Sequence, residues 1–402
     1  MSSPSVAVTG LGAVSAFGWG VEPLWRGLCS GDCALGPFDR FEHSAYATHL
    51  AGQVPPAPAE LAAKVADWRR LAWADRFALA ASLEATAGGL PQGTVGAFFA
   101  SSTGGMLEGE KFYGGLERFA GEGSDQPGIA WLVSQQVSSP AENVARTLGL
   151  QGPVETVSSA CASGTLALGL ALDALRSGEV DAALVGGADS LCRTTYSGFN
   201  SLRSVDERPC RPFRDDRAGL SIGEGGAALL LEPLESARRR DVEILALLAG
   251  SGASSDSHHM TAPQPEGEGA ARALRRAIAD AGLEADDLSF VNAHGTGTPH
   301  NDAAEWRALE AILGSAAETL PVTSSKACVG HLLGSAGCLE AVATVLGLVH
   351  GKVHPTPGDG AVDPALPVAL VTGEARAVAG RHAVSLNLAF GGCNAAAVFS
   401  RP

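Results

Sequence analysis

The sequence lacks the segments that direct a chain to or across a membrane. Its N-terminus, MSSPSVAVTGLG, has no basic region followed by an apolar run and a cleavage site. No window reaches the ~18 consecutive apolar residues of a membrane span. We therefore expect a soluble, cytoplasmic protein that has no membrane partner.

Basic residues are also scarce. The chain has 28 Lys and Arg against 43 Asp and Glu, which gives a formal net charge of −15. Nucleic acids and anionic membranes select basic surfaces. We expect no nucleic-acid partner, and an acidic protein partner would need a local concentration of basic residues.

Paired CxxC spacing is absent from the eight cysteines, and most of them have apolar neighbours. This disfavours disulfides and a zinc site, so we expect no metal and regard the thiols as available for packing or chemistry. The cysteines stand at positions 29, 33, 161, 192, 210, 328, 338 and 393.

Small and apolar residues are abundant: 46% of the 402 residues are hydrophobic and 51 are glycine. This composition predicts an α/β protein whose helices pack closely on sheets. Short apolar runs predict buried strands at Val6–Thr9, Val95–Ala100, Ala182–Val185, Ala227–Leu231, Phe290–Asn292 and Ala395–Phe399. Helical patterns predict helices at Trp73–Ala87, Ala162–Arg176, Gly269–Ala281, Asp302–Leu313 and Leu339–Val349.

The chain contains a quasi-repeat. A cysteine-bearing turn precedes the small-residue helix Ala162–Arg176, and the segment KACVGH precedes a similar stretch, Leu332–Gly351. We infer two related halves, 1–240 and 241–402, divided in the charged stretch ESARRRD, which is typical of an exposed linker. The segment Gly10-Leu-Gly12 lacks the third glycine of a dinucleotide fingerprint, and we interpret it as a turn at a sheet edge.

Cys161 is the candidate nucleophile. It lies in VSSACASG, directly before a predicted helix, where unpaired N–H groups and the helix dipole favour a thiolate. A lone cysteine is more often a small buried hydrophobe. We interpret four other cysteines in that way: Cys29, Cys33, Cys192 and Cys338.

Two histidines stand at element junctions. His294 lies in VNAHGTGTP, where a strand runs into a glycine-rich turn, and strand ends are where ligands meet α/β proteins. His331 lies in SSKACVGHLLG, where a neutral ring can present one N–H inward. Lys326, in the same apolar segment, needs a counter-charge if it is buried, and Glu340 is the candidate.

Together these motifs resemble the elongating beta-ketoacyl-acyl carrier protein synthases, the ketosynthases of the thiolase superfamily. The resemblance covers essentially the whole chain and implies a duplicated, five-layered α-β-α-β-α thiolase-like fold. It is carried by TVSSACASG, RPFRDDRAGLSIGEGGAALLLE, SDSHHMTAP, VNAHGTGTPHNDAAE, SSKACVGHLLGSAGCLEA and AFGGCNA.

The resemblance implies a mechanism. An acyl group passes from the phosphopantetheine arm of an acyl carrier protein to Cys161, and malonyl carrier protein then loses carbon dioxide to give a carbanion that attacks it. The N–H groups of Cys161 and Phe390 would form an oxyanion hole, and His294 and His331 would stabilise the enolate. Lys326 and Glu340 would fix His331. No cofactor beyond the carrier's pantetheine takes part.

The resemblance also assigns binding residues. Thr296, Thr298 and Thr261 would contact the pantetheine arm, Thr103 would border the acyl pocket, and Phe390 would gate the acyl tunnel. Because carrier proteins are acidic, we expect a basic docking patch. Its candidate members are Lys64, Arg69, Arg70 and Arg203.

Departures from the common pattern leave alternatives open. Thr103 stands where a bulkier aliphatic residue is usual, and Leu388 and Ala389 replace a phenylalanine and a glycine, so chain length and the choice between fatty-acid and polyketide or polyene synthesis stay open. The chain could form a homodimer or the active half of a heterodimer with a chain-length-factor-like subunit. A thiolase that uses Cys393, or a non-catalytic partner, is disfavoured by the presence of Cys161 with both histidines.

Overall fold

The computed structural model describes residues 5–119 and 130–402, and ten of the strands in its large sheet form two sets of five. The first set is β1 (Val6–Ser15), β5 (Val95–Ala100), β6 (Val154–Val157), β7 (Ala182–Asp189) and β8 (Gly225–Pro233). The second set is β9 (Ala246–Ser255), β10 (Leu288–Asn292), β11 (Pro321–Thr323), β15 (His382–Leu388) and β16 (Cys393–Ser400).

The two sets have the same topology. Across the sheet, the first set runs β6-β5-β7-β8-β1 and the second runs β11-β10-β15-β16-β9. In each set the second strand pairs in parallel with the third and with the fourth. The fifth strand pairs antiparallel with the fourth and with the first. The sets join where Val6–Val8 of β1 lies antiparallel to Ala246–Leu248 of β9. The quasi-repeat seen in the sequence is therefore a repeat of topology.

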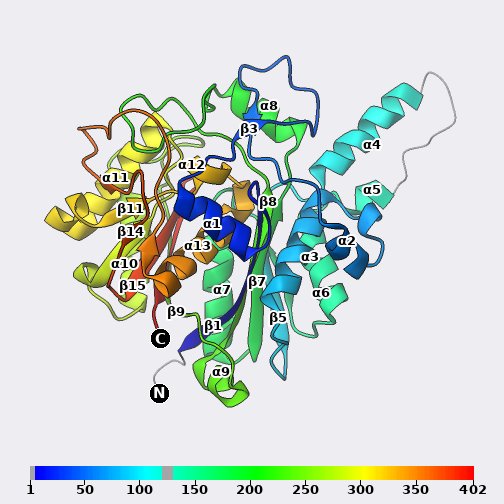
Figure 1. The fold of residues 1–402 in the computed structure, drawn as a ribbon, viewed down its shortest axis with the longest axis horizontal. Helices are drawn as coiled ribbons and strands as arrows, with labels where there is room; N and C mark the ends of the chain where they lie inside the picture. Colours follow the sequence, from blue (N-terminus) through cyan, green and yellow to red (C-terminus); the bar gives the residue numbers. More distant parts are fainter. Residues whose placement is uncertain (1–4, 120–129) are drawn as a thin grey trace.

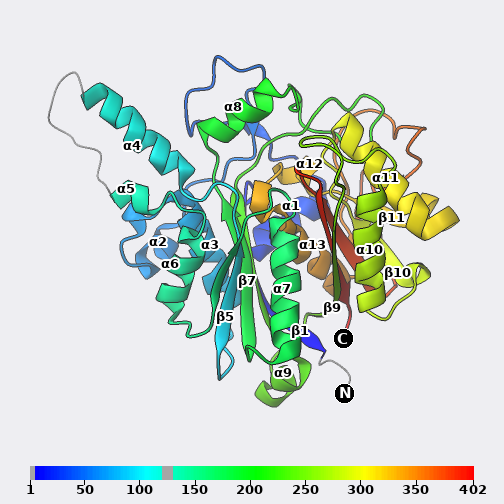
Figure 2. The same cartoon turned by 180° about the vertical axis from the view of Figure 1, so that it is seen from behind.

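Helices form three layers around the two strand sets (Figures 1 and 2). On the outer face of the first set lie α3 (Trp73–Ala85) and α6 (Ser139–Leu148), and α10 (Glu268–Asp280) and α11 (Pro299–Leu313) lie outside the second. Between the sets lie α7 (Ser163–Ser177) and α13 (Ala336–His350), which contact each other and both sets. The result is the predicted α-β-α-β-α order.

The two central helices approach each other closely because their contact is built from small residues. A Cβ atom at Gly164 of α7 would lie 2.6 Å from the backbone nitrogen of Cys338, and one at Gly337 would lie 2.7 Å from that of Thr165. Glycine at these positions lets the N-terminal parts of both helices meet. The residues that precede each helix are thereby brought to the same place.

The interpretation of Gly10-Leu-Gly12 as a turn at a sheet edge was wrong. Both glycines lie within β1, which is a central strand. A Cβ atom at Gly10 would lie 1.9 Å from the carbonyl oxygen of Ala85, and one at Gly12 would lie 1.8 Å from that of Ala81. The glycines therefore allow α3 to pack directly on the strand.

Every predicted strand and helix overlaps an element of the same type. The sequence patterns did not predict α6, β6, β9, β11 and β15, which are described above, nor the remaining elements. The added helices are α1 (Val21–Ser30), α2 (Ala59–Lys64), α4 (Met106–Phe119), α5 (Ala130–Val133), α8 (Arg193–Ser201), α9 (Leu234–Arg240) and α12 (Lys326–Val329). The added strands are β2 (Gly18–Trp19), β3 (Gly36–Pro37), β4 (Leu50–Ala51), β12 (Lys352–Val353), β13 (Ala369–Leu370) and β14 (Arg376–Ala377).

Two segments differ from their sequence interpretation. The charged stretch expected to be a linker forms α9, which ends at Asp241 in a left-handed conformation. The segment Leu333–His350, which includes α13, is long and apolar enough to span a membrane, contrary to our reading that no such window exists. In the structure 89% of it is buried, so its apolar character is accounted for by its position between the two strand sets.

Candidate active site

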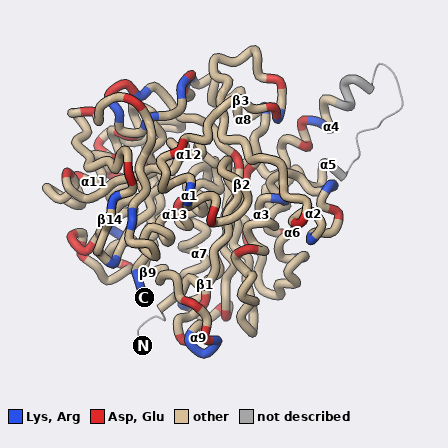
Figure 3. The backbone as a smooth tube through the Cα atoms, in the orientation of Figure 1, with Lys and Arg blue, Asp and Glu red and all other residues tan. Residues whose placement is uncertain are grey.

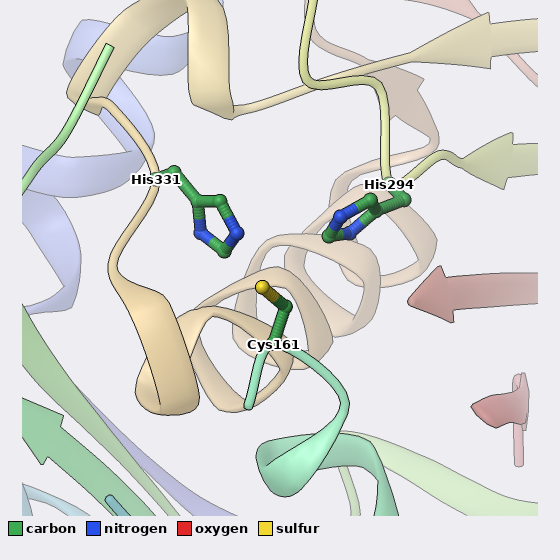
Figure 4. Close-up of side chains that lie close together, drawn as sticks. All are labelled: Cys161, His294 and His331. Atoms are coloured by element: carbon green, nitrogen blue, oxygen red, sulfur yellow. The ribbon is translucent and has the colours of Figure 1, made fainter. Parts of the chain in front are cut away.

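Cys161 lies in a tight turn at the start of α7. The preceding residue, Ala160, has a φ of 46°, which is uncommon outside glycine. Ser163 holds this turn, because its Oγ accepts the N–H of Ser159 at 2.7 Å and donates to the carbonyl oxygen of Ala160 at 2.6 Å. The turn aims the Cys161 sulfur at the two imidazole rings (Figure 4).

The Cys161 thiol is not the thiolate that its helix position suggested. Burial raises its pKa to about 11, although the Lys326 ammonium and the N–H of Phe390 act in the opposite direction. Desolvation of the charged form thus outweighs the helix N-terminus. At neutral pH the group is a protonated thiol, with the N–H of Phe390 directed at its sulfur.

His294 follows the end of β10 and is held on two sides. Its backbone N–H donates to Oε1 of Glu305 at 2.6 Å. Its Nδ1 lies 3.2 Å from Nζ of Lys326 and 3.2 Å from Nδ2 of Asn387. Both of these nitrogens are donors, so Nδ1 is the acceptor and Nε2 carries the ring proton.

His331 lies between α12 and α13 and takes the same tautomer. The backbone N–H of Leu333 donates to its Nδ1 at 3.1 Å, which leaves the proton on Nε2. That Nε2 atom is buried and has no hydrogen-bond partner within the described chain. A buried donor without a partner is costly, and it marks a place where a ligand oxygen would bind.

The three side chains converge although they come from distant parts of the chain. The Cys161 sulfur and ring nitrogens of His294 and His331 lie within 4.8 Å of one another. The rings stand edge to face with centroids 5.3 Å apart. The pKa of both imidazoles lies well below its usual value near 6.5. Burial is the larger cause, and the Lys326 ammonium is the second. Two neutral N–H donors therefore face one protonated thiol.

The ion pair expected to fix His331 contacts His294 instead. Lys326 and Glu340 are both buried and form an ion pair, and Asn387 donates from Nδ2 to the second Glu340 oxygen at 2.6 Å. Lys326 is the first residue of α12, and its Nζ lies 3.2 Å from Nδ1 of His294. His331 relies on the backbone of Leu333.

Glu305 is a further residue whose part was missed. Its carboxyl group accepts the N–H groups of His294 and of Gly295, the second at 2.8 Å. Burial raises its pKa to about 8. It lies within the quoted VNAHGTGTPHNDAAE motif, eleven positions after His294, on one face of α11. The sequence shows only an acidic residue at this spacing, and its burial and its contacts are seen in the structure.

A cavity of about 430 Å³ leads to the three side chains. Thr261, Thr296 and Thr298 line it, and Thr296 and Thr298 share a hydrogen bond of 3.0 Å between their hydroxyls. Phe390 lines it as well, and its ring lies 5.7 Å from that of Phe199. The positions predicted to contact the substrate arm thus surround one opening.

Thr103 does not line this cavity. Its backbone N–H and its hydroxyl donate to Asp189, at 2.7 and 2.9 Å. A role for Thr103 beside the acyl chain stays a prediction. Cys393, the second cysteine of the thiolase alternative, is also absent from the cavity lining.

The four predicted docking residues do not form one patch. Arg203 follows α8 and lines the cavity. Lys64 lies in α2, with Arg69 and Arg70 just beyond it, and α2 and α8 stand apart in both ribbon views. Along the backbone trace in Figure 3, the positions of Lys and Arg are scattered among those of Asp and Glu. Of the four residues, Arg203 lines the cavity and the other three do not, and a docking role for any of them stays a prediction.

Duplicated halves, paired central helices and a thiol facing two imidazoles define a thiolase-like class of protein. Comparisons with known proteins identify the family within that class. Residues 3–237 match the family model described as beta-ketoacyl synthase, N-terminal domain, and residues 245–358 match the beta-ketoacyl synthase, C-terminal domain. The chain belongs to the beta-ketoacyl synthase family.

Individual relatives span the full length of the chain. It is 33% identical over 408 residues to 3-oxoacyl-[acyl-carrier-protein] synthase 2 of Staphylococcus aureus (strain COL), with 98% of each chain covered. Among solved structures, the ishigamide ketosynthase/chain length factor has a TM-score of 0.93 and 31% identity, with 100% of both chains covered. A type II PKS ketosynthase in complex with its acyl-carrier protein has a TM-score of 0.90 and 26% identity, again over 100% of both.

Proposed function

We propose that this chain catalyses decarboxylative condensation of a Cys161-bound acyl group with malonyl-acyl carrier protein. The observation that carries the proposal is the pair of imidazoles, each fixed by donors to its Nδ1 so that its Nε2–H is free to face the sulfur. Two converging neutral donors suit an oxygen that gains negative charge during the reaction.

In the first half-reaction, the Cys161 sulfur attacks the thioester carbonyl of an acyl carrier protein. The sulfur–carbonyl bond forms, the bond to the pantetheine sulfur breaks, and the thiol proton leaves with the pantetheine thiol. The N–H groups of Cys161 and Phe390 hold the oxyanion of the tetrahedral intermediate, and each such donor is typically worth ~3–4 kcal/mol. The thiol is protonated at rest, so proton transfer accompanies attack.

In the second half-reaction, malonyl carrier protein occupies the same cavity. Its carboxylate leaves as carbon dioxide, and the electron pair passes into the thioester as an enolate whose oxygen accepts the Nε2–H groups of His294 and His331. The enolate carbon then attacks the acyl-Cys161 carbonyl. A new carbon–carbon bond forms, and Cys161 leaves and regains a proton from solvent.

Lys326 acts in this scheme by keeping His294 neutral and oriented. Burial is the largest cause of the low pKa of the His294 ring, and the Lys326 ammonium lowers this pKa further. Nδ1 therefore stays an acceptor and Nε2 stays the donor. Glu340 balances the buried ammonium, and Asn387 supplies the second donor to Nδ1. No step requires a metal or a cofactor beyond the pantetheine of the carrier protein.

The test of the activity is an assay with acyl carrier proteins loaded with acyl chains of graded length. The purified chain is expected to form an acyl-enzyme and to release carbon dioxide from malonyl carrier protein, and Cys161→Ala is expected to form no acyl-enzyme. The products distinguish fatty-acid from polyketide or polyene synthesis. An acyl-enzyme formed by Cys161→Ala would contradict the proposed nucleophile.

A second possibility is that the chain is the active subunit of a heterodimer with a chain-length-factor-like protein. The observation in its favour is the match over the full chain to the ishigamide ketosynthase/chain length factor. Native mass measurement of the chain, alone and after co-expression with such a subunit, distinguishes a homodimer from a heterodimer. Cytoplasmic location and the division into domains at residue 240 stay predictions.

A further inference from the structure

A second group of thiols lies beside α12, the helix that begins at Lys326. Cys33 is exposed, Cys210 is buried, and both line a cavity of about 270 Å³ that is separate from the one at Cys161. Cys328, in α12, is their neighbour, because the adjacent Ala327 lines the same cavity. The proposed condensation uses none of these three thiols.

These thiols are not arranged as a metal site. Soft metals need several donor atoms around one centre. Within residues 5–119 and 130–402, the three donors of Cys161, His294 and His331 form the only such group lying within 4.8 Å of one another. Two thiols that face one solvent-reached cavity are better suited to oxidation.

Cys210 is tied directly to both catalytic segments. Its Sγ donates to the carbonyl oxygen of Lys326 at 3.3 Å. Its backbone N–H donates to Oγ of Ser221 at 3.0 Å, and the carbonyl oxygen of the same Ser221 accepts the N–H of His331 at 2.8 Å. A shift of the Cys210 sulfur therefore disturbs the residues that orient His294 and hold His331.

The segment that carries Cys33 is attached to the same helix. The N–H of Ala34, the next residue, donates to the carbonyl oxygen of Cys328 at 2.8 Å. Cys33 and Cys210 thus approach α12 from two different parts of the chain. A covalent bond between them would change the anchoring of α12 from both sides.

We propose that Cys33 and Cys210 form a reversible redox pair that lowers activity when oxidised. A hydroperoxide or a low-molecular-weight disulfide is the oxidant. Each thiol gives up one electron and one proton as the sulfur–sulfur bond forms, and the hydroperoxide is reduced to an alcohol and water, or the disulfide to two thiols. Oxidation removes the S–H donor to the Lys326 carbonyl, and attack by a reducing thiol restores it.

The speed of oxidation follows from the environment of the thiols. Partial desolvation raises the pKa of Cys33, although the residue is exposed, and full burial raises that of Cys210 to about 12. Little thiolate is present at neutral pH, so oxidation is expected to take longer than at a low-pKa sensor cysteine. Hours rather than seconds of exposure are therefore appropriate in the test.

The first test maps the bond and does not depend on the proposed activity. The full-length Cys161→Ala chain is incubated with oxidised glutathione or hydrogen peroxide, alkylated, digested and examined by peptide mass spectrometry. A peptide pair joining positions 33 and 210, lost after dithiothreitol, is expected. Both cysteines recovered as alkylated free thiols, or Cys33 joined only to glutathione or to Cys328, would overturn the assignment.

The second test links the bond to activity. Treatment of the chain with oxidised glutathione is expected to lower condensation by about 10-fold, as loss of a residue that orients a catalytic group typically does, with recovery in dithiothreitol. Cys33→Ser should keep its initial activity and resist the treatment, whereas Cys29→Ser, a half-buried thiol outside the cavity, should remain sensitive. If Cys33→Ser lost as much activity as the original chain after the treatment, the loss would come from oxidation of Cys161, and the proposal would be refuted.

Discussion

Replacement of Lys326 by methionine separates the electrostatic part of the site from its packing. The change keeps most of the side-chain volume and removes the ammonium that contacts His294 and Glu340. Glu340 is then a buried carboxylate without its counter-ion. Breaking a buried ion pair in this way typically costs about 3–5 kcal/mol of unfolding free energy.

The expected change in melting temperature follows from chain length. With about 2.1 cal/mol/K of unfolding entropy per residue over 402 residues, a loss of about 4 kcal/mol lowers Tm by about 5 °C. Differential scanning calorimetry measures this directly. Removing both charges in Lys326→Met with Glu340→Gln should restore most of the lost stability, because no buried charge is left unpaired.

Catalysis should not recover with stability. In both variants Nδ1 of His294 loses one of its two donors and the charge that lowers the ring pKa. We expect release of carbon dioxide from malonyl carrier protein to fall by about 10–100-fold in each. The assay compares the initial rates of the two variants at equal folded concentration. A double variant that regains both stability and activity would show that Lys326 serves the fold alone and would refute the reasoning.

Alkylation of Cys161 by iodoacetamide should accelerate by about 10-fold per pH unit between about pH 7 and 10, because its pKa is near 11 and the thiolate fraction grows with pH; a plateau near pH 7 would contradict this. Gly12→Ala should lower Tm markedly or prevent folding, since its Cβ would lie 1.8 Å from a backbone oxygen, whereas Gly36→Ala, with open space around it, should leave Tm nearly unchanged. Arg203→Glu should raise KM for carrier-bound substrate, and Lys64→Glu should not. An equal rise of KM in both variants would support one docking patch that includes both residues.

The sequence was sufficient to predict the helices and strands that have a strong hydrophobic periodicity or lie in a dense motif. The helix that follows Cys161 and the stretch after His331 are rich in small residues because they lie between two sheets, and that composition is legible without coordinates. The glycines of β1 were misread for a related reason. A glycine that makes a turn and one that admits a helix look alike in a single sequence, and only the position of α3 distinguishes them.

The residues of the candidate site were predictable from the sequence, but the contacts among them were not. Motif resemblance named Cys161 and the two histidines, yet it assigned Lys326 and Glu340 to His331 because these residues are near it in sequence. The ring that they contact, His294, belongs to another element and is brought there by folding. The protonation of Cys161 was mistaken likewise, because the helix dipole is visible in the sequence and the depth of burial is not.

The most direct measurement is the rate of carbon dioxide release from malonyl carrier protein by His294→Ala and His331→Ala, beside the rate of Cys161 acylation in the same preparations. Loss of one positioned donor to a developing oxyanion is expected to slow decarboxylation by about 100-fold or more. Acylation should be affected much less, since its oxyanion accepts backbone N–H groups. Decarboxylation at the original rate in both variants would contradict the claim that the two imidazoles stabilise the enolate.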